Sequence, residues 1–261
     1  MQHISETMAK VLFESGEISK ITINRPDKFN ALDAETIKLI TSYVKKASKD
    51  SKCRCIIITG SGGKAFCAGA DVNYIAKIKT KREAESFFDL LYKMHKEIDE
   101  SPKGVIAAIN GYCLGGGNEL AIACDIRIAT IDSIFGQPEA MLGIVPGAAT
   151  YSLPRIIGIG RAKEMILTGK SISSGKALRM GLVNSVCDKN DLMKNAINMC
   201  RHIAACSPGA VASAKHVINK TSAPEYRYAK KAFVESLLSK EGRERTKAFL
   251  ERKKVKSANM N

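Results

Sequence analysis

The stretch that decides the fold is Val105–Ala123, VIAAINGYCLGGGNELAIA. Its first five residues, Val105–Ile109, form an apolar run that is typical of a strand buried on both faces. Asn110–Gly117 predicts a glycine-rich connection, and Glu119–Ala123 predicts a helix. A buried strand that leads through glycines into a helix indicates an α/β fold with a parallel sheet.

The same alternation continues on both sides of this stretch. Ile18–Ile23, Cys55–Thr59 and Ile126–Ala129 have the β-branched composition of further strands. Helices with one apolar face are predicted after Asp33, a typical N-cap residue, and after Thr80, which begins a capping-box pattern. The first two-thirds of the chain therefore predict strands that alternate with helices.

The last third of the chain, after Gly147, has an almost wholly helical pattern. The predicted segments are Ala162–Leu167, Ser174–Met180, Leu192–Ala205 and the long basic run Ala229–Lys256. We divide the chain into a core at residues 1–200, which holds the active site, and a helical region at residues 201–261. The helical region is expected to cover the core or to mediate assembly.

Composition limits the class of protein. The chain has 261 residues, 45% of them hydrophobic, and a formal net charge of +15. This suits one sizeable domain, and the positive charge favours anionic partners such as nucleic acid or a phosphorylated small molecule. The chain contains no apolar run of membrane-spanning length, and the N-terminus MQHISETMAK lacks the apolar segment of a secretory signal. We expect a cytoplasmic protein with no membrane partner.

The cysteines and the glycine-rich loops exclude several classes of site. The eight cysteines contain no C-x-x-C pair, and the histidines lie apart from them except for His202, which stands between Cys200 and Cys206. Buried reduced thiols are therefore expected and no metal. The segment Gly60–Ala65, GSGGKA, superficially suggests a phosphate-binding loop. It lacks a glycine at Ile58 and the magnesium-binding hydroxyl at Ala65, and it does not match a dinucleotide fingerprint.

Two carboxylates beside glycines are the candidates for chemistry. The three glycines Gly115–Gly117 let a ligand approach main-chain N–H groups at a helix N-terminus, where an oxyanion would be stabilised. Glu119 follows in the first turn, and Glu139 lies in the apolar segment Phe135–Gly147, FGQPEAMLGIVPG. Partial burial raises a carboxyl pKa and suits proton exchange. Taken singly, each glutamate also fits a structural role, as a helix-dipole partner or a semi-buried ion pair.

Several short motifs occur in a fixed order between Ile18 and Val186. They are Asn24-Arg25-Pro26, Asn30-Ala31-Leu32, Ala65–Asp71, Ala107–Glu119, Cys124–Ala129, Phe135–Glu139 with Leu142-Gly143-Ile144, and Gly181-Leu182-Val183. Through these motifs the chain resembles the crotonase (enoyl-CoA hydratase/isomerase) superfamily. The resemblance implies a crotonase-like spiral of ββα units. It also implies a C-terminal helical trimerisation region, which gives a homotrimer or a dimer of trimers.

The resemblance also implies an activity and its residues. The reaction is the reversible addition of water to the 2,3-double bond of a short-chain trans-2-enoyl-CoA, or the reverse dehydration of a 3-hydroxyacyl-CoA. Glu119 and Glu139 would be catalytic, and the amides of Ala70 and Gly116 would form an oxyanion hole. The implied contacts to the substrate and its coenzyme A are Ala68, Ala70, Asp71, Val72 and Gly116. No cofactor is implied beyond the coenzyme A of the substrate.

Two alternatives stay open, and the sequence departs from the family pattern at two places. The first alternative is an isomerase or another acyl-CoA enzyme of the superfamily. The second is an RNA-binding protein, because the superfamily includes an AU-rich-RNA binder. However, no RRM or KH signature is present, so nucleic acid is not an expected partner.

Asn118 replaces a Cys that is frequent at this position in the family, which predicts a packing difference. Ala148-Ala149-Thr150 replaces a glycine-rich run, which leaves the preferred acyl length open. Lys64 is a candidate contact for the coenzyme A phosphates.

Overall fold

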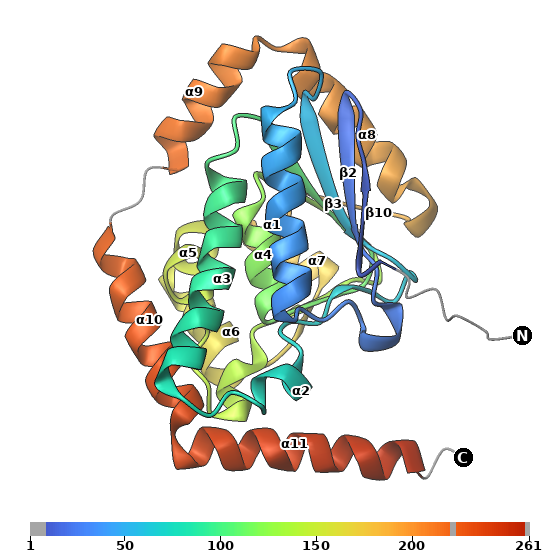
Figure 1. The fold of residues 1–261 in the computed structure, drawn as a ribbon. Coiled ribbons are helices and arrows are strands. Elements are labelled where there is room, and N and C mark those ends of the chain that lie inside the picture. The colour runs from blue at the N-terminus through green and yellow to red at the C-terminus, as the bar shows by residue number, and fades with distance from the viewer. Residues whose placement is uncertain (1–8, 220–222, 259–261) are drawn as a thin grey trace, which may run out of the picture.

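Two β-sheets organise the molecule in the computed structural model, which describes residues 9–219 and 223–258 (Figure 1). The large sheet has the strand order β1-β2-β3-β5-β7-β10, and the small sheet has the order β4-β6-β8-β9. The strands are β1 (Val11–Glu14), β2 (Ile18–Ile23), β3 (Cys55–Gly60), β4 (Ala65–Cys67), β5 (Gly104–Ile109), β6 (Tyr112–Leu114), β7 (Ile126–Thr130), β8 (Ile134–Gly136), β9 (Ile172–Ser173) and β10 (Ser185–Cys187).

Helices follow most pairs of strands and form the C-terminal third. The α-helices are α1 (Ala34–Lys49), α2 (Val72–Ile75), α3 (Lys81–Asp99), α4 (Gly116–Ala123), α5 (Ala149–Ile157), α6 (Ile159–Thr168), α7 (Ser174–Met180), α8 (Leu192–Ala205), α9 (Pro208–Asn219), α10 (Ala223–Leu238) and α11 (Lys240–Ala258). Three short 3₁₀ helices are η1 (Pro26–Lys28), η2 (Pro138–Leu142) and η3 (Lys189–Asp191). The predicted N-cap at Asp33 and the capping box at Thr80 are both present.

The chain moves between the two sheets in a repeated pattern. Strands β3, β5 and β7 pair in parallel in the large sheet, and each is followed directly by a strand of the small sheet, β4, β6 or β8. A helical segment then leads to the next pair. This succession of ββα units confirms the predicted α/β fold and its crotonase-like spiral. The trimerisation role of the C-terminal helices stays a prediction.

The large sheet is covered on both faces, as its apolar strands predict. In β3, Ile56 and Ile58 belong to the main core with α1 and α3, whereas Cys55 and Ile57 pack with Ala196 of α8. Alternate side chains of a strand point to opposite faces, so one strand serves both clusters. Figure 1 shows α1 and α3 on one side of the strands and α8 on the other.

The structure adds strands that the sequence patterns do not reveal. Tyr112–Leu114 forms β6 within the predicted glycine-rich connection, and Gly116 and Gly117 already belong to α4. In the expected helical third, Ser185–Cys187 pairs in parallel with β7 as the edge strand of the large sheet. Three residues are too few to give a periodic pattern, and their pairing partners lie far away in sequence.

The C-terminal helices pack on the core. The predicted domain boundary at residue 200 lies within α8, and α10 contacts α3 through Phe233, whose ring centroid lies 5.2 Å from that of Phe88. The predicted basic segment forms α10 and α11, which meet at Ser239. In the described ranges, no helix is both long and apolar enough to cross a membrane. All eight cysteines are unpaired and six are buried, as expected for reduced thiols.

Candidate active site

The glycines at the start of α4 are required by close approach. Gly115 has φ +53° and ψ −127°, and a Cβ added there would lie 2.8 Å from Oε1 of Glu139. A Cβ added to Gly117 would lie only 2.1 Å from the carbonyl oxygen of Cys67 in β4. Because no side chain fits at either position, the N-terminus of α4 lies directly against β4 and beside Glu139.

Two main-chain N–H groups lie together at this N-terminus. Leu32 forms a parallel bridge with Ala70, in which the N–H of Leu32 donates to Gly69 and the N–H of Asp71 donates to Leu32, both at 2.8 Å. This pairing leaves the N–H of Ala70 facing the opposite side. A Cβ on Gly116 would lie 3.5 Å from the nitrogen of Ala70. Gly116 is the first residue of α4, so its N–H has no acceptor within the helix.

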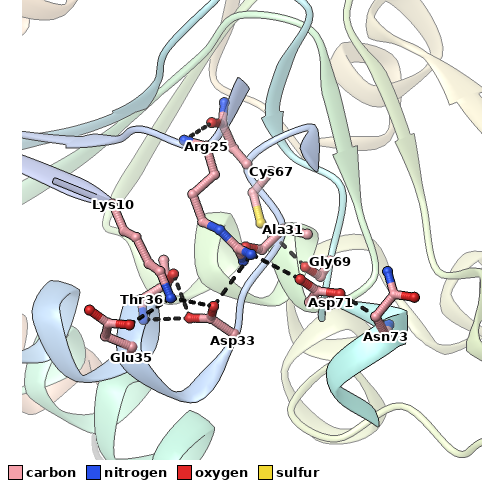
Figure 2. Close-up of polar contacts among 11 residues, drawn as sticks. Lys10, Arg25, Ala31, Asp33, Glu35, Thr36, Cys67, Gly69, Asp71 and Asn73 are labelled. Atoms are coloured by element: carbon pink, nitrogen blue, oxygen red, sulfur yellow. Dashed lines mark hydrogen bonds and ion pairs between the residues drawn. The ribbon is translucent and has the colours of Figure 1, made fainter. Parts of the chain in front are cut away.

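A partly buried ion-pair network holds the Ala70 segment in place (Figure 2). The guanidinium of Arg25 contacts Oδ2 of Asp71 at 3.0 Å and Oδ2 of Asp33 at 3.3 Å, and it also donates to the carbonyl of Ala31. The other carboxylate oxygen of Asp71 accepts the N–H of Asn73 and caps α2. Arg25 therefore ties together the loop before α1 and the loop before α2, with Ala70 adjacent.

Asp33 is the second anchor of this network. Burial opposes its ionisation, but hydrogen bonds from Lys10 and from Thr36 and the charge of Arg25 lower its pKa to about 2. The same carboxylate caps α1 by accepting the N–H of Thr36 at 2.8 Å. Asp33 is therefore ionised at neutral pH, and it balances the charge of Arg25.

Glu119 is a buried carboxylate held by the main chain of a neighbouring helix. Its residue is 3% exposed, and Oε1 accepts the N–H of Ala149 at 2.9 Å. Ala149 is the first residue of α5, so a helix N-terminus faces this carboxylate. Burial raises the pKa of Glu119, and the backbone hydrogen bonds from residues 147–149 counteract part of that increase.

Glu139 lies on the opposite side of the glycine turn, in the first turn of η2. Its Oε1 accepts a hydrogen bond from Nε2 of Gln137 at 3.0 Å. Within the described residues, its buried Oε2 has no hydrogen-bond partner. Burial and then the charge of Glu119 raise the pKa of Glu139, while the bond from Gln137 lowers it. Two carboxyl groups of raised pKa therefore share one site with the main-chain N–H groups of Ala70 and Gly116.

A small, partly open cavity lies next to Glu119, between α3 and the start of α5. Its volume is about 10 Å³, which is room for about one water molecule. Its described lining is mostly apolar and aromatic and consists of Phe88, Leu91, Tyr92, His95, Glu119, Gly147, Ala148 and Tyr151. His95 is buried, its Nε2 has no hydrogen-bond partner among the described residues, and burial lowers its pKa to about 4. The imidazole is thus neutral at physiological pH.

The predicted contact residues fall into two groups. Glu119, Glu139, Ala70 and Gly116 come together at the start of α4. Ala68, Asp71 and Val72 flank Ala70 and are partly exposed. The carboxylate of Asp71 is occupied by Arg25 and by the α2 cap, so the atoms that it can offer a ligand are those of its main chain.

Some supporting residues were not identified from the sequence. Gln137 and Arg25 lie inside recognised motifs, so their motif positions were a usable signal. Ala149 acts through its N–H, which any residue except proline could supply, and no sequence signal marks it. In the part of the chain that the structure describes, no group of three His, Cys, Asp or Glu side chains could hold a metal ion.

Comparison with known proteins identifies relatives of this chain. The family model for enoyl-CoA hydratase/isomerase matches residues 14–258. The short-chain-enoyl-CoA hydratase of Clostridium acetobutylicum is 37% identical over 250 residues, which cover 94% of this chain and 95% of that protein. The crotonyl-CoA hydratase of Syntrophomonas wolfei is 36% identical over 250 residues, covering 94% of this chain and 96% of that protein.

A solved structure gives the same result in three dimensions. The crystal structure of enoyl-CoA hydratase from Bacillus halodurans aligns with a TM-score of 0.85 at 28% sequence identity, covering 92% of this chain and 100% of that chain. The family model spans nearly the whole sequence, and the relatives match over nearly their full lengths. The chain therefore belongs to the enoyl-CoA hydratase/isomerase family.

Proposed function

We propose that this protein is an enoyl-CoA hydratase, a hydro-lyase that adds water to the 2,3-double bond of a short-chain trans-2-enoyl-CoA. The observation that carries the proposal is the meeting of the buried Glu119 and the half-buried Glu139 with the amides of Ala70 and Gly116 at the N-terminus of α4. The relatives named as short-chain-enoyl-CoA and crotonyl-CoA hydratases support the same reaction.

The two amides are suited to the thioester carbonyl. As water attacks C3 of the substrate, negative charge develops on the carbonyl oxygen of the enolate-like transition state. N–H groups of Ala70 and Gly116 donate to that oxygen, and the N-terminus of α4 adds its dipole. Each well-placed donor of this kind is worth roughly 3–4 kcal/mol of barrier. The Arg25 network keeps the Ala70 donor in position.

The two glutamates divide the proton transfers. Glu119 is held by the N–H of Ala149 and has a lower pKa than Glu139, so its ionised form takes a proton from the attacking water as the C3–O bond forms. Glu139, protonated because its environment raises its pKa, delivers a proton to C2. The net addition is one water, and each carboxyl group exchanges its role in the reverse dehydration. The coenzyme A part of the substrate lies along Ala68, Asp71 and Val72, and no further cofactor takes part.

We expect the acyl chain to end near the small cavity beside Glu119. A cavity of only about 10 Å³ with an aromatic wall leaves little room for a long chain and so favours a short one. We expect the hydration rate, measured as kcat/KM, to be highest for crotonyl-CoA and to fall as the enoyl chain lengthens. A rate that rises with chain length would contradict this assignment of the cavity.

Substituting Glu139→Gln tests the reaction directly. The variant preserves shape but cannot deliver a proton, so we expect crotonyl-CoA hydration to fall by roughly 100- to 10,000-fold. Loss of the conjugated double bond is followed by ultraviolet absorbance, and binding of butyryl-CoA is measured by calorimetry and should stay within about twofold. The exposed Glu251→Gln is the matched control. Full turnover in Glu139→Gln would refute the proposal.

The isomerase alternative has its own substrate test. A 3-enoyl-CoA that is converted to the 2-enoyl isomer faster than crotonyl-CoA is hydrated would favour isomerisation.

Family resemblance further supports a homotrimer or a dimer of trimers in the cytoplasm. Light scattering of the purified protein determines the assembly, and a monomer would contradict that part of the proposal.

A further inference from the structure

Two buried amide side chains connect the helix that carries Glu119 with the carboxyl group of Glu139. Asn118 and Gln137 are both 0% exposed. Nδ2 of Asn118 donates to Oε1 of Gln137 at 2.9 Å, and Nε2 of Gln137 donates to Oε1 of Glu139 at 3.0 Å. The sequence predicts only a packing difference at Asn118, but its side chain is the origin of this relay.

The direction of the relay distinguishes the two oxygens of Glu139. A primary amide presents donors at one end and an acceptor at the other. Because Asn118 occupies the acceptor end of Gln137, the NH₂ group of Gln137 faces Oε1 of Glu139. A proton on Oε1 would point at that NH₂ group and is disfavoured. Oε2 is buried and, among the described residues, has no partner.

We propose that Asn118 and Gln137 are positioning residues that fix Oε1 of Glu139 as a hydrogen-bond acceptor, so that Oε2 carries the proton exchanged with the substrate. The inference rests on the proposed hydratase function. During hydration the O–H bond at Oε2 breaks as the C2–H bond forms, and the electron pair of that O–H bond stays on the carboxylate. The proton of the attacking water goes to Glu119 at the same time, so the charges balance.

Removing Asn118 should release the orientation of Gln137. The amide can then turn and present its carbonyl oxygen to Glu139, which places the proton on Oε1 in a hydrogen bond. That bond stabilises the protonated form and raises the pKa of Glu139 further. Among the charged groups of the described residues, Glu119 on α4 is the one whose charge raises the pKa of Glu139. Asn118→Leu leaves Glu119 itself unchanged.

Kinetics of Asn118→Leu and Gln137→Met test the relay. For each we expect kcat to fall about 10-fold with KM within about twofold, because a positioned proton donor contributes roughly 100- to 10,000-fold and only its alignment is lost. The limb of the kcat profile at high pH should shift upward in Asn118→Leu. In the Gln137→Met background, Asn118→Leu should have no additional effect. Unchanged kcat and pH profile, or independent additive effects, would overturn the proposal.

Infrared difference spectroscopy of the free protein gives a readout without turnover. The carbonyl stretch of protonated Glu139 is identified by its loss in Glu139→Gln. In the unmodified protein that carbonyl is Oε1 and accepts from Gln137, so the band should move to higher frequency in Gln137→Met. If the band does not move, the relay is rejected, whether or not the protein hydrates crotonyl-CoA. If the band does not move and the protein does hydrate crotonyl-CoA, the relay is rejected while the proposed hydratase function stands. If Asn118→Leu does not fold, Gln137→Met carries both tests.

Discussion

At the scale of single residues, Gly117 determines how closely α4 can approach β4. A methyl group at this position would meet the carbonyl oxygen of Cys67 at 2.1 Å, and main-chain atoms cannot turn aside as a side chain can. The nitrogen of Gly116 would move with the helix, away from that of Ala70. The alignment of the N–H groups of Ala70 and Gly116 therefore depends on residue 117 being a glycine, which has no side chain.

The variant Gly117→Ala should lose both stability and rate. We expect a loss of about 1–3 kcal/mol in the free energy of unfolding from overpacking, measured by urea denaturation. We also expect kcat to fall more than KM rises, since the oxyanion donors act in the transition state. Gly160→Ala is the control, because nothing lies within 4 Å of its added Cβ. Equal behaviour of the two variants would show that the contact with Cys67 is unimportant.

The raised pKa values of Glu119 and Glu139 predict how stability depends on pH. A carboxyl group of raised pKa keeps its proton in the folded state at pH values where the unfolded chain has released it. The folded state then binds more protons, so stability falls as pH rises from the ordinary value of 4.5 through the raised pKa. Below 4.5 both states are protonated and the effect disappears.

Glu139→Gln removes one of these groups and should weaken that decline. Between about pH 5 and about pH 8 the variant should gain at least about 1 kcal/mol relative to the parent protein, the equivalent of one pKa unit. Urea unfolding at a series of pH values measures this difference. The exposed Glu251→Gln should leave the slope unchanged. A steeper decline in Glu139→Gln would mean that burial does not raise this pKa.

At the scale of elements, the sequence predicts long strands and capped helices well. Ile18–Ile23, Cys55–Gly60 and Gly104–Ile109 have six residues each and are rich in β-branched or apolar side chains, so they are long enough for a pattern to appear. Strands of two or three residues, such as β6 and β10, form because distant partners are present, and no local pattern predicts them. Local sequence therefore predicts the central strands of the large sheet, but neither its edge strand β10 nor the small sheet.

The residues of the candidate site also differ in whether local sequence reveals them. Glu119 and Glu139 could be selected from sequence because carboxylates beside glycines are chemically distinctive. The ion pair of Arg25 with Asp71 joins residues 46 positions apart, and the hydrogen bond from Ala149 to Glu119 comes from main chain. Neither leaves a trace in local composition. The glycines at 115–117 indicated a main-chain donor from the sequence itself, whereas the second donor, Ala70, was reached only through the family resemblance.

At the scale of the whole molecule, the C-terminal helices support the segment that carries Glu139. The N–H of Val145 donates to Oγ of Ser236 in α10 at 2.8 Å. A Cβ on Gly242 of α11 would lie 2.3 Å from the carbonyl oxygen of Ser236 and 3.2 Å from that of Gly143. The start of α11 is therefore closely packed between the end of α10 and the turn that follows η2.

Gly242→Ala should separate these elements and loosen the Glu139 segment. We expect faster amide hydrogen exchange at residues 139–145 and a kcat reduced by a few-fold, with the fold of the two sheets unchanged. Gly209→Ala in α9 is the control, because nothing lies within 4 Å of the added Cβ. Exchange that accelerates equally across the large sheet would instead indicate general destabilisation.

The hydrogen bond from the start of α5 to Glu119 has a consequence for how such a protein can diverge. Its donor is a main-chain N–H group, so the amino acids at positions 148–150 can change while the hydrogen bond that stabilises the carboxylate of Glu119 persists. Ala148-Ala149-Thr150, which differs from the glycine-rich run of the resembled family, fits this freedom. What natural selection must preserve here is a path of the peptide backbone, and mutational scans should find these positions more tolerant than their nearness to the chemistry suggests.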